Sequence, residues 1–138
     1  MNIEYRIDEF PSSPKGYRLI TDTQGELSFT IAQARYLVVQ DALIMEFARY
    51  ACSWLRAACA GEWPDFYYAS MDEEEEPIIA FTLHEQDYRV SSCWSENDAP
   101  PMPREQVRDA VAKFLQTLER ELKQQHDLDL AAELVRHG

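Results

Sequence analysis

The stretch DALIMEFARYACSWLRAACAG, residues 41–61, decides the fold of this chain. Its apolar residues recur at the spacing of one helix face: Leu43, Ile44, Phe47, Ala48, Ala51, Trp54, Leu55 and Ala58. Asp41 suits the N-cap position, and Gly61 suits the C-terminal cap. We therefore predict a core helix lying across a sheet. Its polar residues are expected to face solvent: Glu46, Arg49, Ser53 and Arg56.

The residues before this helix predict a strand meander. Ile3, Tyr5 and Ile7 alternate with polar residues, which is the period of a half-buried strand, and the segment 11–16 ends it. We expect a second strand at 17–21, a turn at 22–25, and a third strand around Phe29. The segment 34–39 fits either a short strand or the beginning of the helix.

Three more strands are expected after the helix, at residues 66–70, 78–84 and 88–95. The last two read as a hairpin around residues 85–87. The acidic run, residues 72–76, then lies in the loop between the first two of these strands, and Pro77 marks the return to the sheet. The alternation favours a core position for Phe66, Tyr68 and Trp94.

The C-terminal third predicts a connector followed by a helix. Residues 96–103 contain three prolines and form a rigid connector, and its last residue, Pro103, suits a first helical turn. Residues 124–138 are expected to form either a short helix or a frayed end. The apolar stripe of the helix comprises Val107, Ala110, Val111, Phe114, Leu115, Leu118 and Leu122.

These elements together predict one α+β domain over residues 1–138. We expect an antiparallel sheet of about five to six strands, packed by two main helices in the order βββ-α-βββ-α. The chain has 138 residues, of which 46% are hydrophobic, enough for a single domain with its own core.

The net charge of −12 is concentrated in the middle of the chain. Residues 62–98 hold eleven acidic side chains against one basic residue, Arg89, whereas the two flanking parts carry only −1 each. Nucleic acids and anionic membranes are polyanions, so both are poor partners for this surface. A basic partner or a cation fits it.

The sequence predicts a cytoplasmic protein without disulfides. It has no apolar run of about 18–20 residues, and its first residues lack the features of a secretory signal. Its cysteines, Cys52, Cys59 and Cys93, have no Cys-x-x-Cys spacing, which argues against both a disulfide framework and a zinc site. We expect them to be small core residues.

No pattern in the sequence predicts an enzyme, a cofactor or a metal site. The acidic run lacks the alternating ligands and the glycine of a calcium loop, and its carboxylates share one environment, unlike a catalytic pair. In the predicted hairpin, His84 faces Asp87 while Cys93 lies near Ile78, so no Cys–His pair is expected. The other two histidines, His126 and His137, are expected to be exposed rather than bases or ligands.

The acidic segment is the candidate binding site, because its carboxylates are interleaved with aromatic residues. Acids pair with a partner's arginines, and rings stack on them. The alternative is a solvated loop whose charge protects an apolar sheet edge from aggregation. The candidate contact residues are Glu62, Trp63, Asp65, Tyr67, Asp72, Glu73, Glu74, Glu75 and Glu76.

Several short motifs resemble one group of bacterial proteins. They are EFARY (46–50) with WL (54–55), FYYASMD (66–72), EEPIIAF (75–81), SCW (92–94) and the helix 111–122. The likeness spans residues 26–122 and resembles small bacterial immunity-like proteins of polymorphic and contact-dependent toxin systems. This chain departs from the pattern by two extra acids in the run and a longer stretch at 33–40.

The resemblance implies a non-enzymatic inhibitor that binds a cognate toxin. We expect this acidic protein to neutralise the toxin by occupying a basic site, with the acidic run steering association. The alternative is a general adaptor or regulatory protein-binding module whose C-terminal helix is the contact surface.

Overall fold

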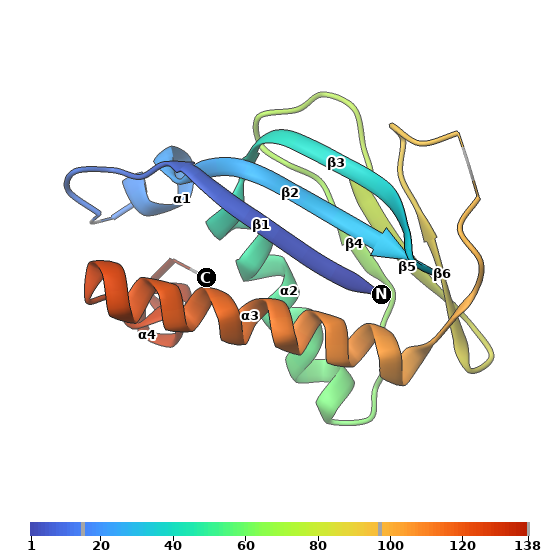
Figure 1. Ribbon diagram of the computed structural model, residues 1–138. Helices are drawn as coiled ribbons and strands as arrows, with labels where there is room; N and C mark the ends of the chain where they lie inside the picture. The colour runs from blue at the N-terminus through green and yellow to red at the C-terminus, as the bar shows by residue number, and fades with distance from the viewer. Residues whose placement is uncertain (15, 97, 138) are drawn as a thin grey trace.

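A computed structural model of the chain describes residues 1–14, 16–96 and 98–137, and for residues 135–137 it describes the backbone alone. Within these residues the chain forms seven strands and four helices (Figure 1). Their order is β1 (Asn2–Glu9), α1 (Arg18–Asp22), β2 (Gln24–Ile31), β3 (Ala34–Leu43), α2 (Ile44–Cys59), β4 (Phe66–Tyr68), β5 (Ile79–His84), β6 (Asp87–Ser91), β7 (Met102–Pro103), α3 (Arg104–His126) and α4 (Leu130–His137).

The α+β class is confirmed, but the strands form two antiparallel sheets rather than one. The first has the order β1-β2-β3 and the second the order β4-β5-β6-β7. The connection from β3 to β4 runs through α2 instead of a tight turn, and these two strands do not pair in the described sheets. A hydrogen bond links the two sheets, donated by the Tyr36 hydroxyl to the Val90 carbonyl at 3.4 Å.

The strand expected at 17–21 is wrong, because this segment forms the short helix α1. Leu19 and Ile20 are consecutive and both fully buried, whereas a strand would turn them to opposite faces. The Leu19 amide donates to the Gly16 carbonyl, and the Thr21 amide donates to the Tyr17 carbonyl. A helical turn is therefore the conformation that buries both side chains.

The turn expected at 22–25 is also displaced, since β2 begins at Gln24. Gly25 lies in the middle of the first sheet, paired with Ile7 on one side and Ala42 on the other. A Cβ atom at Gly25 would lie 1.8 Å from the Arg6 carbonyl oxygen. Strand pairing at this position therefore depends on glycine.

The segment 34–39 is a strand, and β3 continues through Asp41 to Leu43. Asp41 is not an N-cap: it adopts a left-handed conformation with φ of 53°, next to an irregularity in the pairing of β2 with β3. Pairing with β2 extends to Leu43, opposite Gln24, so the helix begins only at Ile44. Sheet pairing here prevails over the local capping preference.

The core helix is confirmed. The side chain of Phe47 contacts Phe29 of β2, Tyr68 of β4 and Phe114 of α3, so α2 joins both sheets to α3. In Figure 1, α2 and α3 lie on the same side of the first sheet. Gly61 follows the helix with φ of +84°, as expected for a C-terminal cap.

The helix expected from Pro103 is confirmed as α3, which begins one residue later at Arg104. All seven residues of its predicted apolar stripe are buried. Its connector includes Asn97, which lies outside the described residues. The terminal segment contains α4, whose Leu130 and Leu134 are buried against the core. His126 is half-buried and stacks on Phe10, so its expected exposure is wrong. His137 has no described side chain, so its expected exposure stays a prediction.

The hairpin of β5 and β6 is confirmed, with His84 paired to Asp87. The strands are shorter than expected: β4 ends at Tyr68, and β6 ends at Ser91 rather than at Ser95. After Ser91 the chain turns, and the Ser92 side-chain oxygen accepts a hydrogen bond from the Trp94 amide. In the described part of the chain, no helix is long and apolar enough to cross a bilayer.

Candidate binding surface at the acidic loop

The acidic loop, residues 69–77, joins β4 to β5 and forms the top of the molecule in Figure 1. Its residues from Met71 to Glu76 are all exposed. Hydrogen bonds close its base: the Ile78 amide donates to the Tyr68 carbonyl, and the Cys93 amide donates to the Pro77 carbonyl, both at 2.9 Å. The loop therefore projects from a fixed base on the second sheet.

A buried carboxylate holds the beginning of the loop. Glu46 on α2 is only 2% exposed, which corrects the expectation that it faces solvent. Its side chain accepts one hydrogen bond from the Tyr68 hydroxyl at 2.7 Å and another from the Met71 amide at 3.1 Å. Burial, together with the nearby Glu46, raises the pKa of Tyr68, so this hydroxyl stays protonated and acts as the donor.

Two aromatic side chains hold the end of the acidic run. The Tyr67 hydroxyl donates to Glu76 at 3.0 Å, and the Trp94 indole N–H donates to Glu75 at 3.2 Å. Partial desolvation and the bond to Glu76 raise the pKa of Tyr67, so it remains a donor. The carboxylates of Glu75 and Glu76 are thus held at the edges of these two rings.

Apolar side chains are exposed on the acidic loop and beside it. Tyr67 is 51% exposed, Met71 57% and Trp94 37%. The exposure of Trp94 corrects its predicted core position: it follows the end of β6, where the strand alternation no longer applies. Phe66 and Tyr68 are buried as expected. We use the term acidic–aromatic surface for Tyr67, Met71, Glu75, Glu76 and Trp94.

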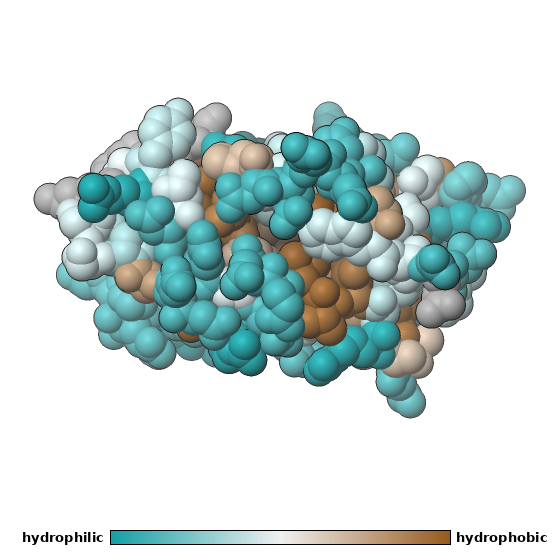
Figure 2. Space-filling view, turned by 90° about the horizontal axis from the view of Figure 1, so that it is seen from above, coloured by the Kyte–Doolittle hydropathy of each residue, from teal (hydrophilic) through white to brown (hydrophobic). Residues whose placement is uncertain are grey.

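The molecule as seen from the side of the loop is mostly hydrophilic (Figure 2). Hydrophobic atoms show through near the middle of this view, with hydrophilic side chains around them. A mixture of apolar and charged groups is typical of protein–protein contact surfaces, in which an apolar centre is surrounded by a polar rim.

Trp63, a predicted contact residue, is half-buried and lies on the connector between α2 and β4. The guanidinium groups of Arg104 and Arg108 lie over its ring, at 4.7 and 5.7 Å from the ring centre. These arginines come from α3, so the ring contacts cations of the same chain. The Pro64 carbonyl beside it accepts hydrogen bonds from Trp54 and Tyr88.

Glu62 and Asp65 lie on the same connector. Both are exposed, and Asp65 accepts a hydrogen bond from the Leu83 amide at 2.8 Å. This connector and the acidic loop adjoin opposite ends of β4. The structure therefore groups Tyr67 with the acidic run but sets Glu62, Trp63 and Asp65 apart from it.

The cysteines are not the core residues that were expected. Cys59 and Cys93 are exposed, Cys52 is half-buried, and all three are free. Cys93 lies beside the acidic loop, and His84 lies at the turn end of the hairpin. The register therefore keeps these two side chains at opposite ends of the second sheet.

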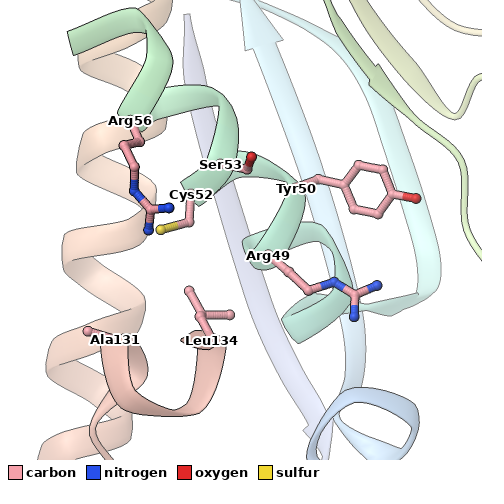
Figure 3. Close-up of a pocket in the computed structure, with 7 residues that line it drawn as sticks. All are labelled: Arg49, Tyr50, Cys52, Ser53, Arg56, Ala131 and Leu134. Carbon is pink, nitrogen blue, oxygen red and sulfur yellow. The ribbon is translucent and has the colours of Figure 1, made fainter. Parts of the chain in front are cut away.

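No clustered metal site emerges from the described residues. Among them, no group of three His, Cys, Asp or Glu side chains could hold a metal ion. A groove of about 570 Å³ runs between α2 and α4 (Figure 3). Its described lining residues include no histidine or carboxylate: Arg49, Tyr50, Cys52, Ser53, Arg56, Ala131 and Leu134.

Cys93 can report on the charge of the acidic loop. Partial burial and, secondarily, the charge of Glu75 raise the pKa of its thiol, which lowers the reactive thiolate fraction. Replacing Glu73, Glu74, Glu75 and Glu76 by glutamine should speed its alkylation at pH 8 a few-fold, measured by mass spectrometry. Cys59, at the end of α2, is the internal control and should react at an unchanged rate. An equal rate change at both cysteines would contradict a local effect.

Comparison with known proteins identifies the family. The family model of a domain of unknown function, DUF7878, matches residues 3–124. The chain belongs to this family. The DUF7878 match begins at the second residue of β1, includes all the other strands and helices α1 and α2, and ends two residues before the end of α3. No curated protein and no solved structure matches the chain. DUF7878 carries no link to toxin systems, so the immunity interpretation stays a prediction.

Among the residues important to this surface, Met71 was not predicted, and the predicted positions of Trp94 and Glu46 were wrong. Trp94 joins the surface only because the loop and the turn after β6 meet. Their proximity in space has no signal in a single sequence. Glu46 has a normal solvent-face position in the helix pattern and becomes buried only because the loop closes over α2.

Proposed function

We propose that this protein binds and neutralises a protein partner through the acidic–aromatic surface. The partner's contact surface is basic, with arginine side chains that pair with Glu75 and Glu76 and stack on Tyr67 and Trp94. The neighbouring carboxylates of Asp72, Glu73 and Glu74 act at longer range by steering association.

One observation carries this proposal. Three large apolar side chains, Tyr67, Met71 and Trp94, are exposed where the chain also concentrates its negative charge. A loop that served only to keep a sheet edge soluble would not need two rings and a methionine exposed beside its carboxylates. Methionine adapts its shape to a partner, and aromatic residues are frequent anchors at interfaces.

The alternative, contact through the C-terminal helix, has less support. The apolar stripe of α3 is wholly buried in the core. Its remaining face carries acidic and basic residues in similar numbers, including Arg108 beside Asp109. Such a face offers neither an apolar anchor nor a strong charge of one sign.

The resemblance in the sequence motifs suggests the kind of partner. We infer an immunity-like role, in which the partner is a bacterial toxin domain with a basic site. Toxins that act on nucleic acids or dinucleotides have basic clefts because their substrates are anionic. An acidic loop can occupy such a cleft, which inhibits the toxin without any chemistry by the inhibitor.

Coexpression tests this function. The genes next to this one are searched for a toxin domain, and that domain is produced in a bacterial host together with either the wild-type protein or a variant with Tyr67→Ala and Trp94→Ala. The wild type should restore growth, and the variant should fail although it accumulates to the same level. Equal protection by both proteins would contradict the proposed surface, and no protection by the wild type would contradict the immunity role.

A further inference from the structure

The geometry points to Glu46 as a positioning residue that fixes the acidic loop in one preformed shape from inside the core. The inference deepens the proposed function and rests on it: the partner meets a preformed array of carboxylates and rings rather than a mobile loop.

Glu46 is an unusual side chain for the core. It is one of five polar or charged residues that are buried in the described part of the chain, and its carboxylate accepts bonds from Tyr68 and Met71. Among the described residues it forms no ion pair. Burying a carboxylate without a cationic partner destabilises a fold. The role of Glu46 must therefore be to hold the Tyr68 side chain and the Met71 amide in place through its two hydrogen bonds.

Those two bonds join α2 to the end of β4 and to the first part of the acidic loop. Tyr68 is the last residue of β4, and Met71 is the third residue of the loop. The Tyr68 ring also packs edge-on against Phe47 and Tyr50 of α2. A carboxylate has two oxygens, so one side chain holds the strand end and the loop backbone in a fixed relation.

Other bonds fix the far side of the loop. Glu75 and Glu76 are held by Trp94 and Tyr67, and the Pro77 carbonyl accepts from the Cys93 amide. The loop is thus exposed in its side chains but tied in its backbone at both ends. A loop ordered before binding loses less conformational entropy when the partner docks, which strengthens association.

The test separates the position of the loop from the stability of the fold. In the double variant Glu46→Leu and Tyr68→Phe, both polar partners are replaced by apolar groups of similar shape, a change that is close to neutral for stability. The Met71 amide then lacks its acceptor, and it can reach water when the loop moves. We expect hydrogen exchange at the Met71 amide to rise by about tenfold while the unfolding midpoint stays unchanged.

Two further variants serve as controls. Glu46→Gln keeps an oxygen that can accept from Met71 and an amide that can donate to the Tyr68 oxygen, so slow exchange at Met71 should be retained. Ser53→Ala, at an exposed position of the same helix, should change neither measurement.

Three outcomes decide the inference. Faster exchange confined to residues 69–73, with an unchanged midpoint, supports it. Unchanged exchange at Met71 overturns it, and so does faster exchange throughout the chain with a lower midpoint, because Glu46 would then be a general structural residue. Failure of the proposed function would give a different result. Partner binding would then be unaffected by removal of the charges of the acidic run, while the Met71 amide would still exchange faster in the double variant.

Discussion

Replacement of Phe47 by alanine should lower the free energy of unfolding by about 3–5 kcal/mol. Phe47 is fully buried, and its ring contacts four others at centre-to-centre distances from 5.2 to 6.0 Å. These rings come from both sheets and from α3: Phe29, Phe66, Tyr68 and Phe114. The change therefore leaves a cavity where every layer meets. Urea unfolding followed by circular dichroism measures the loss.

Tyr67→Ala is the matched control for Phe47→Ala. It removes an aromatic ring from the next strand, but that ring is exposed, so the unfolding midpoint should stay close to that of the wild type. A similar loss of stability in both variants, or a loss below about 1 kcal/mol for Phe47→Ala, would contradict the place of Phe47 at the centre of the core.

Replacing Glu73, Glu74, Glu75 and Glu76 by glutamine should slow association with the basic partner by about ten- to hundredfold at low salt. Glutamine keeps an acceptor oxygen for Tyr67 and Trp94, so the shape of the loop is retained. The dependence of the association rate on salt should also flatten, because fewer charges steer the encounter. Stopped-flow measurements at a series of salt concentrations give both quantities.

A second variant makes the same change in net charge elsewhere. Glu9, Glu105 and Glu119 are replaced by glutamine and Asp109 by asparagine, which alters β1 and α3 but leaves the acidic run intact. Its association rate should stay within about threefold of the wild type, since screened charges far from the contact steer weakly. Equal slowing in both variants would mean that the association rate depends only on the net charge of the protein and not on the position of the charges in the acidic loop.

The main helices and the second hairpin were predictable because their signals are strong and local. The stripe from Val107 to Leu122 keeps the helical period over four turns, and each of its residues is buried as expected. The alternation around Phe81 and Val90 likewise gives the register of β5 with β6. Such patterns depend only on which face of a helix or strand packs against the core, so they can be read from the local sequence.

The errors arise where tertiary contacts outweigh local preference. Leu19 and Ile20 allow a strand by composition, yet both can be buried together only in a helical turn. Asp41 would cap an isolated helix well, but β3 gains two further pairs with β2 by continuing past it. The division into two sheets depends on long-range pairing that no short stretch specifies.

The candidate site was only partly predictable, for the same reason. The acidic run is visible in the sequence as a local excess of charge, and the alternation marks Tyr67 as outward-facing. Trp94 and Glu46 become part of the site through contacts across 19 and 25 residues, with Glu75 and Met71 respectively. Single-sequence patterns carry no information on such pairs.

The central claim is that the partner docks on the surface formed by Tyr67, Met71, Glu75, Glu76 and Trp94. Amide hydrogen exchange of the bound protein, compared with the free protein, tests it most directly. Binding should slow exchange at residues 67–76 and 92–95 and leave the solvent face of α3 unchanged. Slower exchange along α3, with the acidic loop still exchanging as in the free protein, would contradict it.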